Sequence, residues 1–172
     1  MSNSLYDHSV AAYKQGLDGV LLVLDKAADH YRQQEQDIEA LVRFRLHEDM
    51  LPFSFQLHSV LHHSLGAIRG LQTGVFTPPP DMPERSFAGW RQSVSDTAES
   101  LASLSREEVD GLAGGELVFR LSAGEFPFTA ERFVSSFSLP NFYFHVTTAY
   151  DMARMQGVPL SKLDYLGGMG LG

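Results

Sequence analysis

Residues 140–150 read PNFYFHVTTAY, a run that combines a proline, an aromatic cluster and one histidine within a predicted helix. Asn141 and His145 are four residues apart, so a helix places both side chains on one face. Two polar side chains that point the same way from an apolar helix form either a satisfied core pair or part of a site. The run belongs to the last of four long segments in which apolar residues recur at helical spacing.

These four segments cover about residues 8–31, 50–72, 86–104 and 129–156. The second and third are separated by Pro78–Pro83, which can be neither helix nor central strand and indicates a long crossover. We therefore predict an all-α fold, a four-helix bundle with a long crossover between its second and third helices.

The helical period is interrupted between the third and fourth segments. Apolar residues alternate there, which predicts a short β-hairpin of Leu117–Leu121 with Glu125–Phe128, lying against the helices. Within the fourth segment, Pro140 removes one backbone hydrogen bond and predicts a kink over Ser136–Pro140.

Capping residues mark where these helices begin. Asp49, Ser86 and Thr129 are predicted N-caps of the second, third and fourth helices, since their side chains can accept hydrogen bonds from the first turn. A short helix is predicted over residues 38–44, and a further capped turn from Ser105.

Length and composition favour a single soluble domain. The 172 residues predict one domain over residues 1–167, followed by a flexible Gly-rich tail over 168–172. The 13 basic and 21 acidic residues leave a formal charge of -8, which argues against nucleic-acid binding and against attraction to an anionic membrane. The chain has no cysteine and no apolar run of membrane-spanning length, and its first eight residues lack the basic flank and apolar run expected of a signal peptide. We therefore expect a cytoplasmic protein.

The histidines are the main candidates for a site. His145 lies among aromatic residues, so we expect its ring to be buried and either bonded to a backbone carbonyl or acting as a ligand or general base. His63 shares a helix face with small residues and is either structural or part of the same site. His58 and His62 form an H-x-x-x-H pair, whose rings are either partly solvated or able to reach one metal ion.

Several runs resemble a bacterial family that is catalogued as a domain of unknown function. The resemblance covers about residues 4–167, and its most specific part is the string from Leu139 to Tyr150. The matching residues are Ser4–Asp7, Asp49–Pro52, Gln56, His63, Leu139–Tyr150, Gly157–Leu160 and Asp164–Gly167.

That family resembles the DinB/YfiT-like superfamily of four-helix bundles, and the resemblance implies a metal site. Many members of the superfamily bind a divalent metal through three histidines, one from the second helix and two from an H-x-x-x-H on the last. By this resemblance His63, Asn141 and His145 occupy the ligand positions, and the metal would be zinc or nickel. Asn141 replaces an imidazole with a neutral amide oxygen, so we expect weak metal binding or none.

Two functions follow as alternatives. In the first, a small-molecule ligand binds in a pocket between the second and fourth helices, lined by Gln56, His63 and Asn141 with Tyr143 or Tyr150 at its edge. His145 would then be the catalytic base or metal ligand of a transferase or hydrolase. In the second, the protein is a non-catalytic binding or structural bundle, and His63, Asn141 and His145 form a buried polar network. A homodimer is expected in either case, because the aromatic content is high for one small bundle.

Overall fold

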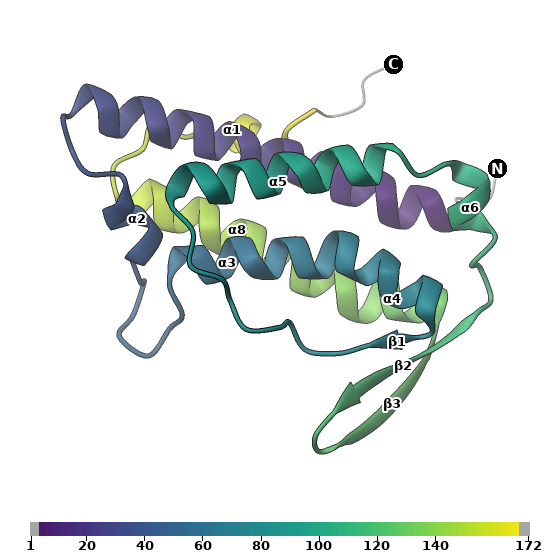
Figure 1. Cartoon of the computed structure of the whole chain (residues 1–172). Coiled ribbons are helices and arrows are strands. Elements are labelled where there is room, and N and C mark those ends of the chain that lie inside the picture. Colours follow the sequence, from purple (N-terminus) through teal and green to yellow (C-terminus); the bar gives the residue numbers. More distant parts are fainter. Residues whose placement is uncertain (1–3, 169–172) are drawn as a thin grey trace.

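The computed structural model describes residues 4–168, most of which are helical (Figure 1). The α-helices are α1 (Ala12–Gln33), α2 (Glu39–Arg43), α3 (Phe53–Leu61), α4 (Ala67–Thr73), α5 (Phe87–Ala102), α6 (Arg106–Asp110), α7 (Ala130–Phe133), α8 (Leu139–Met155) and α9 (Lys162–Leu166). Three π-helical segments interrupt or extend them: η1 (Asp7–Ala11), η2 (His62–Gly66) and η3 (Val134–Ser138). The glycine tail predicted to be flexible lies, from residue 169 on, outside the described residues.

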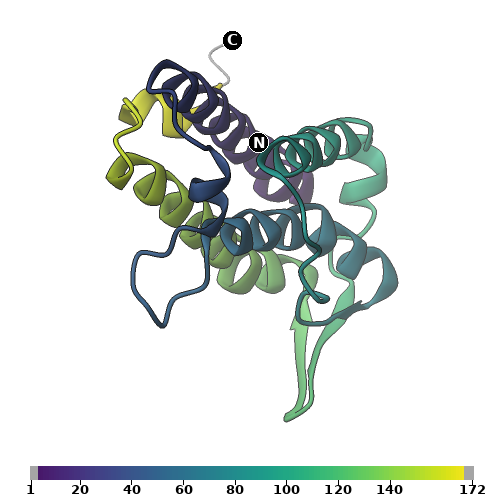
Figure 2. The ribbon, with the colours of Figure 1, turned by 60° about the vertical axis from the view of Figure 1, so that its left-hand side comes forward.

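The long helices pack side by side around one apolar core. α1 contacts α5, α8 and α9, while α3 contacts α5 and α8. Figures 1 and 2 show α1 and α5 lying alongside each other, with the continuous α3–η2–α4 segment and α8 beneath them. Among the largest fully buried side chains are Tyr13, Phe53, Trp90, Phe133 and Phe142, which come from different helices and together fill this core.

A small sheet completes the fold. β2 (Glu116–Leu121) and β3 (Gly124–Thr129) form the predicted antiparallel hairpin, with Leu117 opposite Phe128. β1 (Val75–Phe76), which the sequence did not indicate, pairs with β2 in parallel and places Val75 opposite Val118. The sheet order is therefore β1-β2-β3, and the tip of the hairpin projects away from the helices (Figure 2).

Local signals located most helix ends correctly. The Ser86 and Thr129 side chains accept hydrogen bonds from the backbone nitrogens of Gly89 and Arg132. Ser105 forms a capping box at the start of α6. These predictions are confirmed because each depends on residues within one turn of the chain.

The predicted N-cap at Asp49 is wrong. α3 begins at Phe53 and its N-cap is Pro52, while the Asp49 carboxylate accepts a hydrogen bond from His47 Nδ1 at 2.6 Å. The exposed His47 side chain holds this carboxylate within a turn that is closed by the hydrogen bond from the Met50 nitrogen to the His47 carbonyl, and the helix starts only after Pro52.

Pro140 stands at the start of α8, directly after the π-helical segment η3. The wider π turn falls on Val134–Ser138, where a regular α-helix would bring the proline ring against the preceding turn. The Asn141 side chain, directly after the proline, donates to the carbonyl of Phe137 at 2.7 Å.

Two glycines on α1 allow close packing of the C-terminal part of the chain. A Cβ atom at Gly16 would overlap the ring of Phe142, and one at Gly19 would overlap the carbonyl of Tyr165. α8 and the short helix α9 can therefore approach the α1 backbone directly. Within the described residues, no helix combines the length and apolar character needed to cross a membrane.

Candidate functional site

His63 on η2 and His145 on α8 lie face to face between the two helical segments that cross the core. Their ring centroids are 6.0 Å apart and the ring planes differ by 14°. His63 is buried and His145 is half-buried. The sequence prediction that these two residues come together agrees with this geometry, and we refer to them as the imidazole pair.

Gln56 fixes the tautomer of His145. The Gln56 Nε2 atom donates to the backbone carbonyl of Leu51 at 3.2 Å, which leaves Gln56 Oε1 as the atom that faces His145 Nδ1 at 2.8 Å. Because an amide oxygen only accepts, Nδ1 of His145 must carry the proton. In the neutral ring, Nε2 then holds the free lone pair.

His63 is held through its backbone rather than its ring. Its carbonyl accepts a hydrogen bond of 2.8 Å from Ser138 Oγ, and the Ser138 hydroxyl is 2.7 Å from the hydroxyl of Tyr13. This buried chain joins η2, η3 and α1. Among the described residues, the Nδ1 atom of His63 is buried and has no hydrogen-bond partner.

Both rings of the pair are neutral at physiological pH. Burial, together with the neighbouring His62 and His145 rings, lowers the pKa of His63 to about 3. Burial lowers the pKa of His145 to about 4. Removing an imidazolium ion from water is unfavourable, so each ring keeps a lone pair available near pH 7.

The other predicted site residues are placed differently. The amide nitrogen of Asn141 is engaged by Phe137 of its own helix, so the side chain is not hydrogen-bonded to either imidazole. Tyr143 is 40% exposed on the surface of α8. Tyr150 packs edge to face against Tyr165, with ring centroids 5.8 Å apart. Gln56 is the predicted pocket residue that the structure joins to the pair.

The donors present do not fit a resident zinc or nickel ion. No three His, Cys, Asp or Glu side chains come together as a metal-binding group within residues 4–168. His63 and His145 supply two imidazoles, and the amide of Asn141 is committed in part to Phe137. Zinc sites use four strong ligands or three with a water, usually including a carboxylate or thiolate when fewer than three histidines are present.

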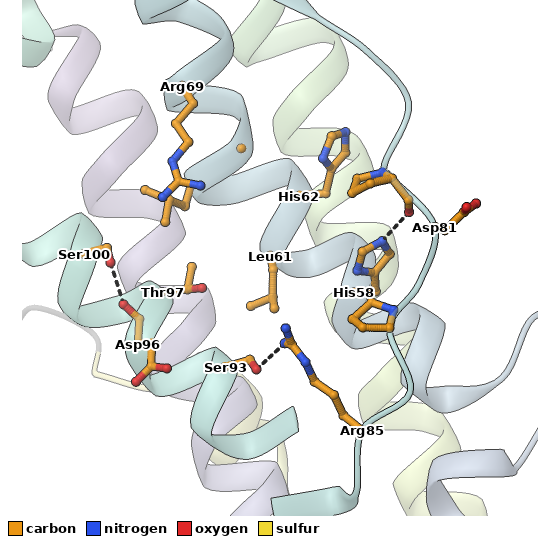
Figure 3. Close-up of a pocket in the computed structure, with 14 residues that line it drawn as sticks. His58, Leu61, His62, Arg69, Asp81, Arg85, Ser93, Asp96, Thr97 and Ser100 are labelled. Carbon is orange, nitrogen blue, oxygen red and sulfur yellow. Dashed lines mark hydrogen bonds between the residues drawn. The ribbon is translucent and has the colours of Figure 1, made fainter. Parts of the chain in front are cut away.

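His58 and His62 lie on the same helical segment as His63 and hold the crossover, and the His62 ring is in contact with the His63 ring, with centroids 5.3 Å apart. His58 Nε2 donates to the carbonyl of Pro80 at 3.0 Å, and His62 Nε2 donates to the carbonyl of Thr77 at 2.9 Å. Each ring thus binds its own crossover carbonyl, and the two are not arranged around one metal position (Figure 3). We call these two residues the crossover pair.

An open cleft lies beside the crossover pair, between the α3–η2–α4 segment, the crossover and α5. Its volume is about 580 Å³ (Figure 3). Sequence reasoning missed it because the path of the crossover is not visible from local patterns. One signal was available: residues 58, 62, 65 and 69 recur every three or four positions and therefore share a helix face.

Comparison with known proteins gives a family and a fold. A family model described as Domain of unknown function (DUF1993) matches residues 5–166. The chain is similar to the crystal structure of a DinB family member protein from Shewanella denitrificans. The TM-score is 0.83 at 26% identity, and the similarity covers 98% of this chain and 94% of that chain. No curated protein matches the sequence.

Proposed function

The chain belongs to the family described as Domain of unknown function (DUF1993), and we propose that it binds a small molecule through the imidazole pair. In this proposal the four long helical segments correspond to a DinB-like four-helix bundle of a bacterial cytoplasmic protein. His63 and His145 present neutral nitrogens between the second and fourth helices of that bundle, and Gln56 orients His145.

The observation that carries the proposal is the unpartnered Nδ1 atom of His63. A buried polar atom without a hydrogen bond costs roughly 1–3 kcal/mol, so it favours either a bound partner or replacement by an apolar group. A purely structural network of His63, Asn141 and His145 would be expected to satisfy its own members. A ligand that brings a hydrogen-bond donor supplies the missing partner.

The surroundings favour a ligand with an aromatic or apolar body. Phe55 and Phe144 lie 6.0 and 5.1 Å from the His145 ring, and Phe137 lies 5.8 Å from the His63 ring, between centroids. Phe144 is 58% exposed, so a ligand would first meet the half-buried edge of His145. Because His63 Nδ1 is enclosed, contact with it requires a side-chain movement, for which the half-buried Phe137 is positioned.

Phenol and anisole provide a matched pair of probes. They share an aromatic ring, but only phenol carries a hydrogen-bond donor. We expect phenol to shift the imidazole NMR signals of His63 and His145 at millimolar concentration, and anisole to shift them much less. We expect these shifts to disappear in His145→Leu. They should persist in the control His58→Leu, because the His58 ring faces the crossover. Equal effects of phenol and anisole, or none at either histidine, would contradict the proposal.

A catalytic role for His145 is the second candidate. The Gln56–His145 hydrogen bond of 2.8 Å orients the ring as a supporting residue orients a general base, and leaves Nε2 free. A pKa of about 4 makes the ring a weak base at neutral pH, which favours binding over proton abstraction. Hydrolysis of 4-nitrophenyl acetate tests this candidate: catalysis requires a rate above the uncatalysed one that is lost in His145→Gln and retained in His58→Gln.

We further propose that the protein forms a homodimer. Large apolar side chains are exposed on several elements, and Tyr143 and Phe144 are adjacent on α8. Clustered exposed aromatics are typical of interfaces. Light scattering at micromolar concentration is expected to give the mass of two chains, and the mass of one chain would exclude the dimer.

A further inference from the structure

The cleft beside the crossover pair contains two guanidinium groups that have no carboxylate partner. Arg69 of α4 and Arg85 of the crossover both line it, and Figure 3 shows their side chains entering from opposite ends, with Leu61 between them. Neither arginine forms an ion pair with another side chain of residues 4–168. Arg85 lies over the Trp90 ring at 5.2 Å and donates to the hydroxyl of Ser93.

The two carboxylates that line the cleft are turned away from these arginines. The Asp81 carboxylate points outward from the crossover in Figure 3. The Asp96 carboxylate accepts a hydrogen bond of 2.7 Å from Gln92. In a chain with a formal charge of -8, two unneutralised guanidinium groups in one concave site create a local positive region.

The wall between the arginines offers hydrogen-bond acceptors and hydroxyl groups. His62 donates through Nε2 to the Thr77 carbonyl, so in the neutral ring Nδ1 carries a lone pair. Burial lowers the pKa of His62, which keeps the ring neutral near pH 7. Gly66, also in the lining, has no side chain to cover Nδ1, since even a Cβ atom there would lie only 3.2 Å from it. The hydroxyl-bearing residues of the lining are Ser93, Thr97 and Ser100.

We propose that this cleft is a binding site for a small anion that carries hydroxyl groups, either a hydroxy-carboxylate or a phosphate ester. Arg69 and Arg85 bind the anionic group, because guanidinium groups match the geometry of carboxylates and phosphates. The hydroxyl groups of the ligand donate to His62 Nδ1 and exchange hydrogen bonds with Thr97. The cleft is lined by neither member of the imidazole pair, so the two proposals are tested with different variants and can fail independently.

Four probes separate the parts of this proposal in isothermal titration calorimetry at neutral pH and low salt. Glycerol 3-phosphate and D-gluconate combine hydroxyls with a phosphate or a carboxylate, inorganic phosphate has the anion alone, and glycerol has the hydroxyls alone. We expect at least one of the two combined probes to bind more tightly than inorganic phosphate, and glycerol to give no binding. The tighter of the two combined probes identifies the anionic group that the site prefers.

Single variants test the residues. Arg69→Gln and Arg85→Gln are each expected to weaken binding of the tighter probe roughly tenfold to a hundredfold, because each removes a charge-assisted contact. Arg132→Gln is the matched control, since Arg132 is exposed on α7 and does not line the cleft. Circular dichroism checks that each variant is folded, which is expected because both cleft arginines are exposed.

Three results would overturn the proposal. The first is the absence of binding by both combined probes. The second is equal affinity for inorganic phosphate, which would remove the role of the hydroxyls. The third is an equal loss of affinity in Arg132→Gln and in the cleft variants, which would show that binding reflects overall charge rather than this site.

Discussion

The imidazole pair and the crossover pair are neighbours, with the His62 and His63 ring centroids 5.3 Å apart, yet their hydrogen bonding differs. His58 and His62 each donate to a carbonyl of the crossover, whereas His63 has a buried nitrogen without a partner. The difference follows from the backbone that faces each pair. A proline-rich crossover forms no regular ladder, so its carbonyls are free to accept. The carbonyls of α8 are used within its own helix, and among residues 4–168 the acceptor that reaches the pair is Gln56 Oε1, which accepts from His145.

The largest effect that tests this difference between the two pairs is a loss of protein stability at acidic pH. The pKa of His63 is about 3 in the folded protein and about 6.5 in the unfolded chain, so the unfolded state binds a proton first as the pH falls. The stability contributed by the neutral ring is complete above pH 6.5 and is lost progressively toward pH 3. At about pH 4.5 the free energy of unfolding should be lower by roughly 2–3 kcal/mol from this ring alone.

Urea unfolding at about pH 7 and pH 4.5 measures this loss. His63→Leu should reduce the acid-induced loss by the amount expected for His63. His58→Leu is the matched control, because its ring keeps its Nε2–H donor to Pro80 whether or not it is protonated. An acid-induced loss that is the same in wild type and in His63→Leu would show that the ring is not enclosed as described.

Ser138→Ala tests the hydrogen bonds that hold the imidazole side of the segment. The change removes the partner of both the Tyr13 hydroxyl and the His63 carbonyl in a fully buried position. We expect a loss of about 2 kcal/mol in the free energy of unfolding. Ser136→Ala, which removes an exposed hydroxyl bonded within its own helix, should cost less than about 0.5 kcal/mol. Equal costs in chemical denaturation would argue against the buried chain.

His62→Leu tests the hydrogen bond that ties the crossover to the helical segment. The Thr77 carbonyl is exposed and can be hydrated, so we expect a loss of about 1 kcal/mol or less in stability. The crossover should nevertheless open more often, and tryptic cleavage after Arg85 should become several times faster. Unchanged cleavage would show that His62 does not hold the crossover.

His63→Leu at neutral pH is expected to have the smallest effect. Replacing a buried ring whose nitrogen lacks a partner by an apolar side chain removes an unsatisfied group, so stability should change by less than about 1 kcal/mol in either direction. Thermal unfolding at pH 7 measures this. A loss of several kcal/mol would indicate that the ring makes a polar contact that the structure does not contain.

Sequence patterns predicted the parts of the fold that depend on nearby residues. The helical segments, the caps at Ser86 and Thr129 and the β2–β3 hairpin each follow from spacing within a few turns of the chain. β1 was missed because a two-residue strand is defined only by its pairing with β2, some forty residues later. The crossover likewise depends on distant partners.

Only part of the candidate site could be predicted from the sequence, because the rest depends on residues that are distant in the chain. The resemblance to the superfamily, together with the helix faces, placed His63 and His145 in one site, but neither revealed that the Asn141 amide would bond to Phe137. The hydrogen bond that His145 donates to Gln56 joins residues 89 positions apart and has no local signal. The positions of Arg69 and Arg85 in one cleft depend on the path of the crossover.

The measurement that tests the central claim most directly is the protonation state of the histidine rings at pH 7, read from their imidazole nitrogen NMR spectra. The hydrogen bond that Gln56 Oε1 accepts from His145 and the burial of both rings predict that His63 and His145 are neutral and that His145 carries its proton on Nδ1. A protonated ring at either position, or a His145 tautomer with the proton on Nε2, would contradict the imidazole pair as a neutral ligand-binding site.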